Sequence, residues 1–196
     1  MVGPVIEGIQ SQNVVANAKH YVNNNQETDR TTDTAVLSER AEFEMYLPPF
    51  EAAVSANVGS IMCSYNKIAI EEFQQAPGFW SCENNQTLNT YLRDHLGFKG
   101  FVMSDWGATH SMSINQGLDQ EMPGNEFMSD ENLAAAVQNG TVLEETIDQS
   151  VLRILTPFFQ VGAFDNPTNG TFPSLYPERV KTTMKYVHTH TQVPSM

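Results

Sequence analysis

Asp105 and Trp106 are the neighbouring residues with the clearest potential for chemistry. They lie within GFKGFVMSDWGATH (97–110), whose apolar residues before Ser104 are typical of a buried strand. Burying a carboxylate costs free energy unless hydrogen bonds or a function compensate. Sugars stack apolar C–H faces on tryptophan, and their hydroxyls need charged or amide partners. Asp105 could therefore be the nucleophile of a retaining glycosidase. Alternatively, Ser104 or Asp105 caps a helix over 107–116.

Two other groups of side chains also stand at expected strand ends. Lys19 and His20 could donate hydrogen bonds to neighbouring sugar hydroxyls or hold a phosphate, or they could form a partly exposed structural pair. Asp119 and Glu121 are two residues apart, so on a strand they face the same side. They could act as an acid/base pair. The alternative is a solvated or hydrogen-bonded rim.

The sequence gives little reason to expect a metal site. Cys63 and Cys82 stand neither in a CxxC pair nor near a histidine at ligand spacing. His188 and His190, in HTHT, could bind a metal, but we interpret this pair in an irregular tail as incidental. We therefore expect no metal and no other cofactor.

Charge and composition restrict the partners of the chain. It has 196 residues, 40% of them hydrophobic, which is enough for one globular domain or a large part of one. Its net charge of −13 repels nucleic acid backbones and anionic lipid, so neither partner is expected. The apolar runs are too short to span a membrane. The first residues, MVGPVIEGIQ, lack a basic region followed by an apolar stretch, so no signal peptide is expected in this chain.

Two cysteines, three N-x-S/T tripeptides and an acidic surface fit a secreted protein better than a cytosolic one. The tripeptides begin at Asn85, Asn139 and Asn169. Ordinary surface polarity is the alternative explanation for each of them.

Short apolar strands alternate along the chain with amphipathic helices, a pattern that predicts parallel βαβ units and an α/β fold. Each expected strand ends in polar residues, and parallel α/β folds gather their chemistry at that end. A strand must also leave the core through a polar loop, which is the plainer explanation. The expected strands cover 14–21, 59–65, 100–106 and 117–124, and the expected helices cover 35–56 (broken near Pro48 and Pro49), 85–96, 107–116 and 130–139.

A last helix is expected to begin near Thr141 and Glu144, which have capping-box spacing, and to run to about Val161. Pro157 should kink it. Residues 67–84 are expected to form a long loop.

Four segments together resemble the family 3 glycoside hydrolases, in particular their β-glucosidase branch. They are AKHYVNN, IMCSYN, LGFKGFVMSDWGATH and GLDQEMPG, and they occur in the family's order between about Gly3 and Phe164. The resemblance implies the C-terminal part of a (β/α)₈ barrel over residues 1–165. A complete barrel takes about 250 residues, so this one is expected to be incomplete at its N-terminal side. Residues 166–196 are then an irregular tail or linker.

The resemblance also implies a role for each matching residue. Asp105 would be the nucleophile that forms the glycosyl-enzyme intermediate, and Trp106 would line the subsite of the non-reducing glucose. Lys19 and His20 would contact sugar hydroxyls. The segment GLDQEMPG would be architectural. Further implied positions are Met62 and Tyr65, which would close the same pocket with the tyrosine hydroxyl near the nucleophile, and Cys63 and Cys82, which would form a local disulfide.

The activity implied is hydrolysis of terminal non-reducing β-D-glucosyl residues by a retaining double displacement. The family's Asp and Arg that grip distal sugar hydroxyls, and the α/β sandwich domain that supplies its acid/base glutamate, have no counterpart in this chain. We therefore expect the chain alone to be weakly active or inactive without the missing barrel half and that domain. A β-xylosidase, an exo-glucanase or a non-catalytic sugar-binding remnant are the alternatives. The N-acetylglucosaminidase branch is disfavoured, because KHYVNNNQETDR has no histidine after its KH pair.

Overall fold

The computed structural model describes residues 1–75, 77–124 and 126–165. The expected tail over 166–196, with His188, His190 and Asn169, lies outside the described residues. The boundary at residue 165 therefore stays a prediction.

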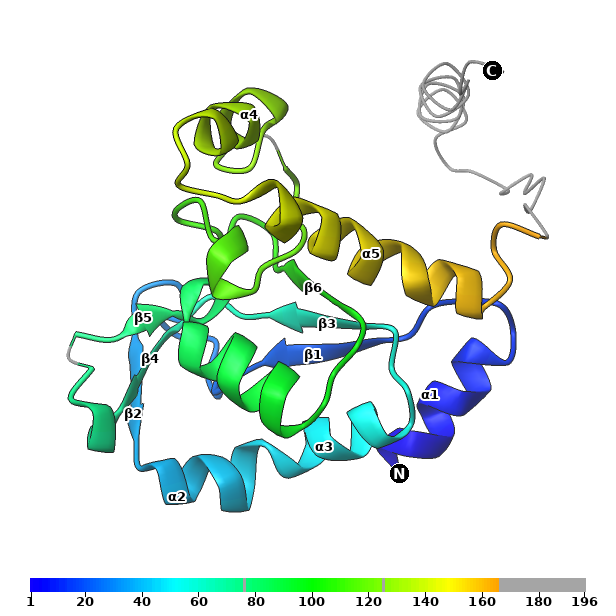
Figure 1. The fold of residues 1–196 in the computed structure, drawn as a ribbon. Helices are drawn as coiled ribbons and strands as arrows, with labels where there is room; N and C mark the ends of the chain where they lie inside the picture. The colour runs from blue at the N-terminus through cyan, green and yellow to red at the C-terminus, as the bar shows by residue number, and fades with distance from the viewer. Residues whose placement is uncertain (76, 125, 166–196) are drawn as a thin grey trace. The chain divides into compact units, whose positions relative to one another are not determined.

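Three parallel strands form the sheet that positions the candidate site (Figure 1). They are β1 (Asn17–Tyr21), β3 (Ser60–Cys63) and β6 (Phe101–Ser104), in the order β1-β3-β6. These strands confirm the predictions over 14–21, 59–65 and 100–106, and with their connecting helices they confirm the α/β class. In the described part of the chain the sheet stays open and does not close into a barrel.

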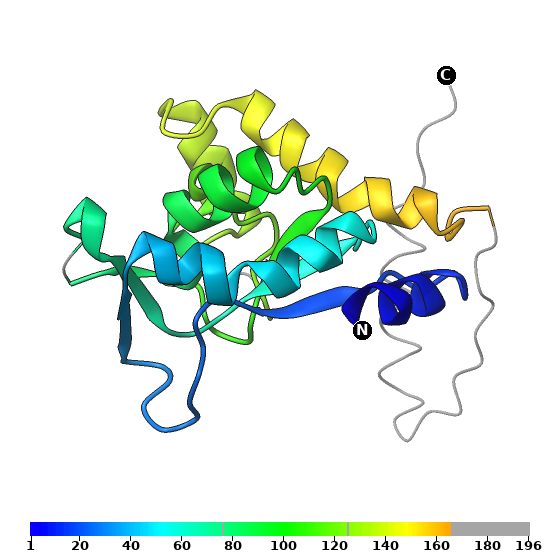
Figure 2. The same ribbon diagram turned by 90° about the horizontal axis from the view of Figure 1, so that it is seen from below.

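Helices bury one face of this sheet. Helix α3 (Pro48–Ser55) packs against β1, and the π-helical segment η4 (Gln86–His95) places Leu88 and Leu92 in the core with Ile61 and Val102. The spacing of Leu88, Tyr91 and Leu92 explains this, since residues three and four apart share a helix face. Figure 2, drawn from below, shows α3 and η4 across the sheet.

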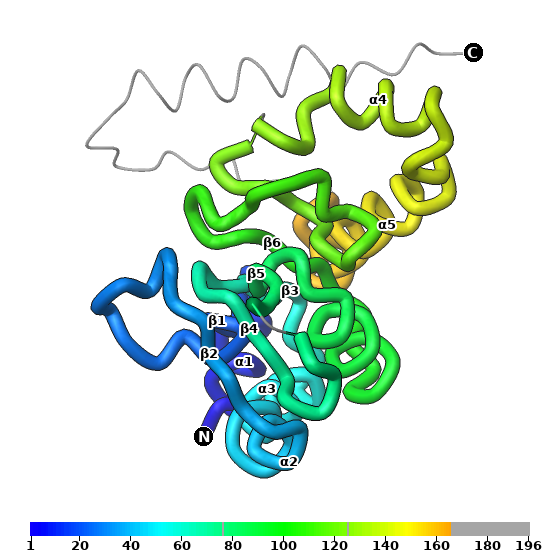
Figure 3. The backbone as a smooth tube through the Cα atoms, turned by 90° about the vertical axis from the view of Figure 1, so that its left-hand side faces the viewer, coloured from blue at the N-terminus to red at the C-terminus, as the bar shows by residue number. Residues whose placement is uncertain are grey.

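A second, smaller sheet corrects two predictions. Strands β2 (Thr34–Leu37), β4 (Lys67–Ile70) and β5 (Phe79–Trp80) form it, with β2 and β4 parallel and β4 and β5 antiparallel. The helix expected from residue 35 and the loop expected over 67–84 were therefore wrong in these parts. Short apolar runs such as TAVL and KIAI suit a strand or a helix, and pairing between the two decides. This sheet lies at the carboxyl ends of β1 and β3 (Figure 3).

The helix predicted over 35–56 is present from Glu39 onward as three consecutive helical segments. Ser38 caps α2 (Glu39–Ala41) by accepting a hydrogen bond from the Ala41 N–H. The π-helical turn η1 (Glu42–Tyr46) follows, and α3 begins at Pro48, a position where proline is tolerated. Two 3₁₀ turns, η2 (Glu71–Phe73) and η3 (Ser81–Glu83), flank β5.

The segment after β6 differs from its prediction. No helix forms over 107–116 apart from the 3₁₀ turn η5 (Ile114–Gln116), and the strand expected over 117–124 reduces to a single bridge between Met103 and Gln120. Gly117 adopts a φ of +108°, and the Ser113 hydroxyl donates to the Ser111 carbonyl, so local bonds compete with a helix. Because no helix follows Asp105, the capping interpretation of that residue was wrong.

Two further helices follow η5, and the second of them packs against the sheet. Helix α4 (Asp130–Gln138) confirms the prediction over 130–139, with Ser129 as its cap. Helix α5 (Glu144–Gln160) packs against β6 and continues through Pro157. Its expected capping box was wrong, because Thr141 donates to the Asn139 side chain instead.

Helix α1 (Val2–Gln10) was not predicted, although Val2, Val5, Ile6 and Ile9 have helical spacing. Within the described part of the chain, no helix combines the length and the apolar character needed to cross a membrane.

Candidate active site

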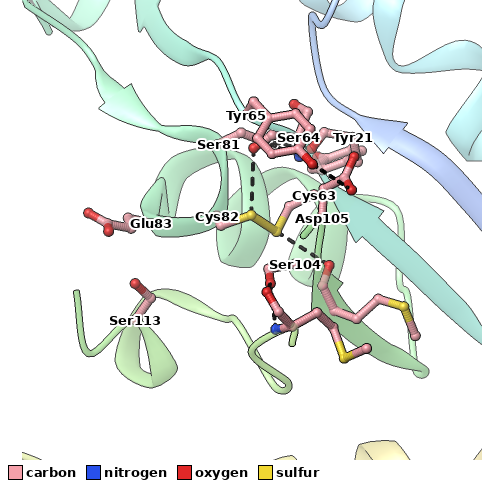
Figure 4. Close-up of a disulfide and its surroundings, with 12 residues drawn as sticks. Tyr21, Cys63, Ser64, Tyr65, Ser81, Cys82, Glu83, Ser104, Asp105 and Ser113 are labelled. Atoms are coloured by element: carbon pink, nitrogen blue, oxygen red, sulfur yellow. Dashed lines mark hydrogen bonds between the residues drawn. A yellow bond between two sulfur atoms is a disulfide. The ribbon is translucent and has the colours of Figure 1, made fainter. Parts of the chain in front are cut away.

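Asp105 directly follows β6, and donors from three segments hold its carboxylate. His20 Nε2 on β1 lies 3.1 Å from Oδ2. The Tyr65 hydroxyl donates to Oδ1 at 3.0 Å (Figure 4). The Trp106 N–H donates to the same oxygen at 2.7 Å. The backbone N–H of Asp105 donates to the Cys63 carbonyl of β3, which fixes where the side chain leaves the sheet. The structure thus brings together three residues that the sequence placed far apart.

His20 contacts Asp105 as a neutral donor. Burial of the imidazole lowers its pKa, Asp105 opposes this by favouring the charged ring, and Lys19 and Arg30 lower the pKa further. At neutral pH the ring is therefore uncharged, and its contact through Nε2 assigns the proton to that nitrogen. Because a neutral donor does not cancel the charge of Asp105, the carboxylate keeps the electron density that a nucleophile needs.

Tyr65 contacts Asp105 as a protonated phenol. Burial raises its pKa, and the hydrogen bond to Asp105 raises it further. The guanidinium of Arg30 lies 4.5 Å from the centre of the Tyr65 ring, a cation–π distance that steadies the ring. The hydroxyl also lies 3.1 Å from the Trp106 carbonyl, so it bridges the backbone beside Asp105.

A buried polar network fixes the positions of His20 and Tyr65 relative to each other. Ser64 and Asn66 flank Tyr65, both fully buried, and each donates a hydrogen bond to the Val22 carbonyl, at 3.2 and 3.1 Å. Ser81 donates to the Tyr21 carbonyl at 2.6 Å. These bonds tie the chain just after His20 to the chain around Tyr65, and a fully paired buried network is rigid. Sequence reasoning missed these positioning residues, although SYN in IMCSYN was their signal.

The other expected substrate-binding residues lie around this centre. Lys19 is exposed on β1. Met62 pairs in register with Met103, which is two residues before Asp105, so Met62 is on the face toward which Asp105 points. The side chain of Trp106 is 62% exposed, an unusual state for tryptophan that leaves its ring free to stack on a ligand.

Asp119 and Glu121 are architectural and do not form an acid/base pair. Asp119 is bound by Arg93 at 2.6 Å and by Arg153 at 2.8 Å, and it accepts the Val102 N–H. The Glu121 carboxylate accepts backbone N–H groups of the following turn, from Glu126 to Met128. Among the described residues no cluster of three His, Cys, Asp or Glu side chains could hold a metal ion.

A disulfide joins Cys63 at the end of β3 to Cys82 in η3, with Cα atoms 5.3 Å apart (Figure 4). It closes a chain segment with a sequence separation of 19 around β4 and β5. A cross-link of this length restricts the conformations of the unfolded chain, and this stabilises the folded state by about 3 kcal/mol.

We therefore expect reduction of the disulfide to lower the free energy of unfolding by about 3 kcal/mol. Urea unfolding with and without dithiothreitol measures the difference. A variant carrying both Cys63→Ala and Cys82→Ala should match the reduced protein and should not respond to dithiothreitol. Coincident unfolding curves for the oxidised and reduced protein would contradict this expectation.

Residues 1–156 match the glycosyl hydrolase family 3 N terminal domain. The chain belongs to glycosyl hydrolase family 3. It is 46% identical over 166 residues to a probable β-glucosidase L of Emericella nidulans, covering 80% of this chain and 21% of that protein. A β-glucosidase of Rhizobium radiobacter is 45% identical over 163 residues, covering 82% of this chain and 19% of that protein.

Solved structures of β-glucosidases share the fold. A β-glucosidase from Chaetomella raphigera superposes with a TM-score of 0.75 at 43% identity, over 82% of this chain and 22% of that one. β-Glucosidase 3B from Thermotoga neapolitana, solved with glycerol, gives 0.76 at 34% identity, over 89% of this chain and 25% of that one. The chain spans about a fifth of the length of the curated relatives it matches.

Proposed function

We propose that this family 3 chain carries the nucleophile of a β-glucosidase, which hydrolyses terminal non-reducing β-D-glucosyl residues with retention. The observation that carries the proposal is the cradle of Asp105, a carboxylate beside an exposed tryptophan and held by neutral donors. The β-glucosidase names of the relatives support the substrate class.

The hydrogen bonds of Asp105 indicate which oxygen attacks. Oδ1 accepts from both Tyr65 and Trp106, whereas within the described part of the chain Oδ2 has only His20 as a partner. Oδ2 therefore keeps a lone pair for the anomeric carbon. In the first step the Oδ2–C1 bond forms, the glycosidic C1–O bond breaks, and the departing oxygen takes a proton from an acid. In the second step water attacks C1, its proton leaves to a base, and the carboxylate departs.

The remaining roles follow from position. Trp106 stacks on the sugar and Met62 closes the pocket. Lys19 donates to sugar hydroxyls, and His20, whose proton on Nε2 contacts Asp105, accepts from a hydroxyl through Nδ1. The acid/base has no candidate among the described residues, since Asp119 and Glu121 are bound to other groups. We therefore propose that the chain alone turns over substrates with good leaving groups far better than cellobiose, whose leaving oxygen needs a proton.

The test compares 2,4-dinitrophenyl β-D-glucoside with cellobiose, using the purified chain. We expect release of dinitrophenol, no detectable cleavage of cellobiose, and β-glucose as the first product in a proton NMR time course. Faster release of dinitrophenol from the matching xyloside would instead identify xylosides as the substrate class. α-Glucose as the first product would contradict a retaining mechanism.

A non-catalytic sugar-binding domain is the second candidate, favoured because the residues that the structure describes offer no acid/base. Reversible glucose binding in calorimetry, with no dinitrophenol released, would support it over the enzyme.

Replacement of Tyr65 by Phe tests the hydroxyl that contacts Asp105. Tyr65→Phe removes one donor from Oδ1 and keeps the ring under Arg30. We expect the rate of dinitrophenol release to fall about 10-fold, the cost of one hydrogen bond to a charged group. Tyr46→Phe is the matched control, since among the described residues its hydroxyl has only the exposed Asn25 amide as a hydrogen-bond partner. An unchanged rate in Tyr65→Phe would contradict a role for the hydroxyl.

We also propose that the protein functions outside the cytosol, in an oxidising compartment. The disulfide and the exposed asparagines of two N-x-T tripeptides, Asn85 and Asn139, support this. Glycans at either asparagine after expression in the native host would test it.

A further inference from the structure

Glu42 and Asn23 form a buried pair that the proposed reaction does not use. Glu42 begins η1 and is 0% exposed, and Asn23, just after β1, is 5% exposed. Asn23 Nδ2 donates to Glu42 Oε2 at 2.9 Å. The other oxygen of each group, Glu42 Oε1 and Asn23 Oδ1, is buried without a hydrogen-bond partner in the described part of the chain.

The two unpaired atoms cannot satisfy each other while Glu42 is ionised. A carboxylate oxygen and an amide oxygen are both acceptors only, and each buried atom without a partner costs free energy. One proton changes this, because a carboxylic acid has an O–H donor. A proton on Oε1 lets Glu42 donate to Asn23 Oδ1 while Oε2 still accepts from Asn23 Nδ2.

We propose that Glu42 is a neutral carboxylic acid in the folded protein and pairs with Asn23 through two hydrogen bonds, as an acid–amide ring. The ring leaves neither side chain with an unpaired oxygen. It joins η1 to the turn that follows β1, in which Asn23 lies three residues after His20, and so fixes the chain where it leaves the candidate site.

The surroundings of Glu42 favour the neutral acid. Tyr21 of β1 and Tyr91 of η4 are the titratable groups that face it, and Tyr91 in turn donates to Glu39 of α2. All of these are neutral or negative. On its own segment, Glu44 is exposed and pairs with Arg40. Burial raises the pKa of Glu42 to about 7, and the Asn23 N–H opposes this rise.

The direction of the pH effect follows from this pKa. Below pH 4.5 Glu42 is protonated in both the folded and the unfolded chain. Between pH 4.5 and about 7 the unfolded chain ionises while the folded chain keeps its proton, so stability falls as pH rises. Above pH 7 the loss is complete. Its full size is about a 300-fold change in the unfolding equilibrium constant, since the two pKa values differ by about 2.5 units.

The variant Glu42→Gln separates this pair from every other titrating group. A glutamine amide can make the same two hydrogen bonds to Asn23 but cannot ionise. Urea unfolding at pH 5 and pH 8 gives the ratio of the unfolding constants of wild type and variant. We expect that ratio to rise about 100-fold from pH 5 to pH 8. A ratio that is the same at both pH values would overturn the proposal.

A matched control and a direct measurement complete the test. Glu44→Gln changes an exposed carboxylate two residues away, and its ratio to wild type should not change between pH 5 and pH 8. The carbon-13 shift of the Glu42 carboxyl, followed by NMR in the folded chain, should titrate near pH 7. A midpoint near 4.5 would overturn the proposal. Neither measurement uses a substrate, so neither depends on the proposed function.

Discussion

Asp105→Asn is expected to reduce dinitrophenol release from an activated glucoside on the order of 10⁴-fold, the scale at which loss of a key catalytic group is felt. The amide has no charged oxygen to attack the anomeric carbon. Its carbonyl can still accept from Tyr65 and Trp106, so the change removes the nucleophile and leaves the cradle in place.

The stability of Asp105→Asn shows whether its loss of activity comes from the missing nucleophile or from unfolding. Because the asparagine keeps the shape and two of the hydrogen bonds, we expect the free energy of unfolding of Asp105→Asn to stay within about 1 kcal/mol of wild type. Asp148→Asn, an exposed change on α5, is the control and should keep both activity and stability. Release at the wild-type rate by Asp105→Asn would assign the nucleophile to another residue.

Asp119→Asn is expected to destabilise the fold by about 3 kcal/mol, because it leaves two largely buried guanidinium groups without their counter-charge. The Asp119 side chain is 0% exposed, and Arg93 and Arg153 are 12% and 22% exposed. Burial lowers the pKa of Arg93, and Asp119 opposes this by favouring the charged guanidinium. Asp119 therefore stabilises the charges of Arg93 and Arg153, and with the Val102 N–H it joins η4, β6 and α5.

Urea unfolding at pH 7 measures this effect, again with Asp148→Asn as the control. Arg153→Met should cost less than Asp119→Asn, because Asp119 then keeps Arg93 and the Val102 N–H. If Asp119→Asn lowers the free energy of unfolding by less than about 1 kcal/mol, these ion pairs are screened by solvent and contribute little to stability.

The sequence predicted the strands that carry the site better than the chain between them. Strands β1, β3 and β6 are apolar runs with clear ends, and their parallel pairing follows from the helices between them. The second sheet was missed because TAVL and KIAI become strands only by pairing with each other across about 30 residues. The expected helix over 107–116 failed because serine side chains and positive-φ glycines stabilise a loop there.

For the site, spacing alone left Asp105 between a helix cap and a nucleophile, and the family resemblance favoured the nucleophile. The structure then placed His20 and Tyr65 against its carboxylate. The roles of Ser64, Asn66 and the Glu42–Asn23 pair could not be predicted, because each depends on contacts between segments distant in sequence. Hydrophobic patterns describe which face is buried, but they do not say which buried polar atoms meet.

The most direct test of the central claim, that Asp105 is the nucleophile, is covalent trapping. The purified chain is incubated with 2,4-dinitrophenyl 2-deoxy-2-fluoro-β-D-glucoside, whose leaving group needs no acid, and peptide masses are then recorded. We predict one fluoroglucosyl adduct, on Asp105, in wild type and in Asp148→Asn, and none in Asp105→Asn. An adduct on another carboxylate, or a folded chain that stays unlabelled, would contradict the account.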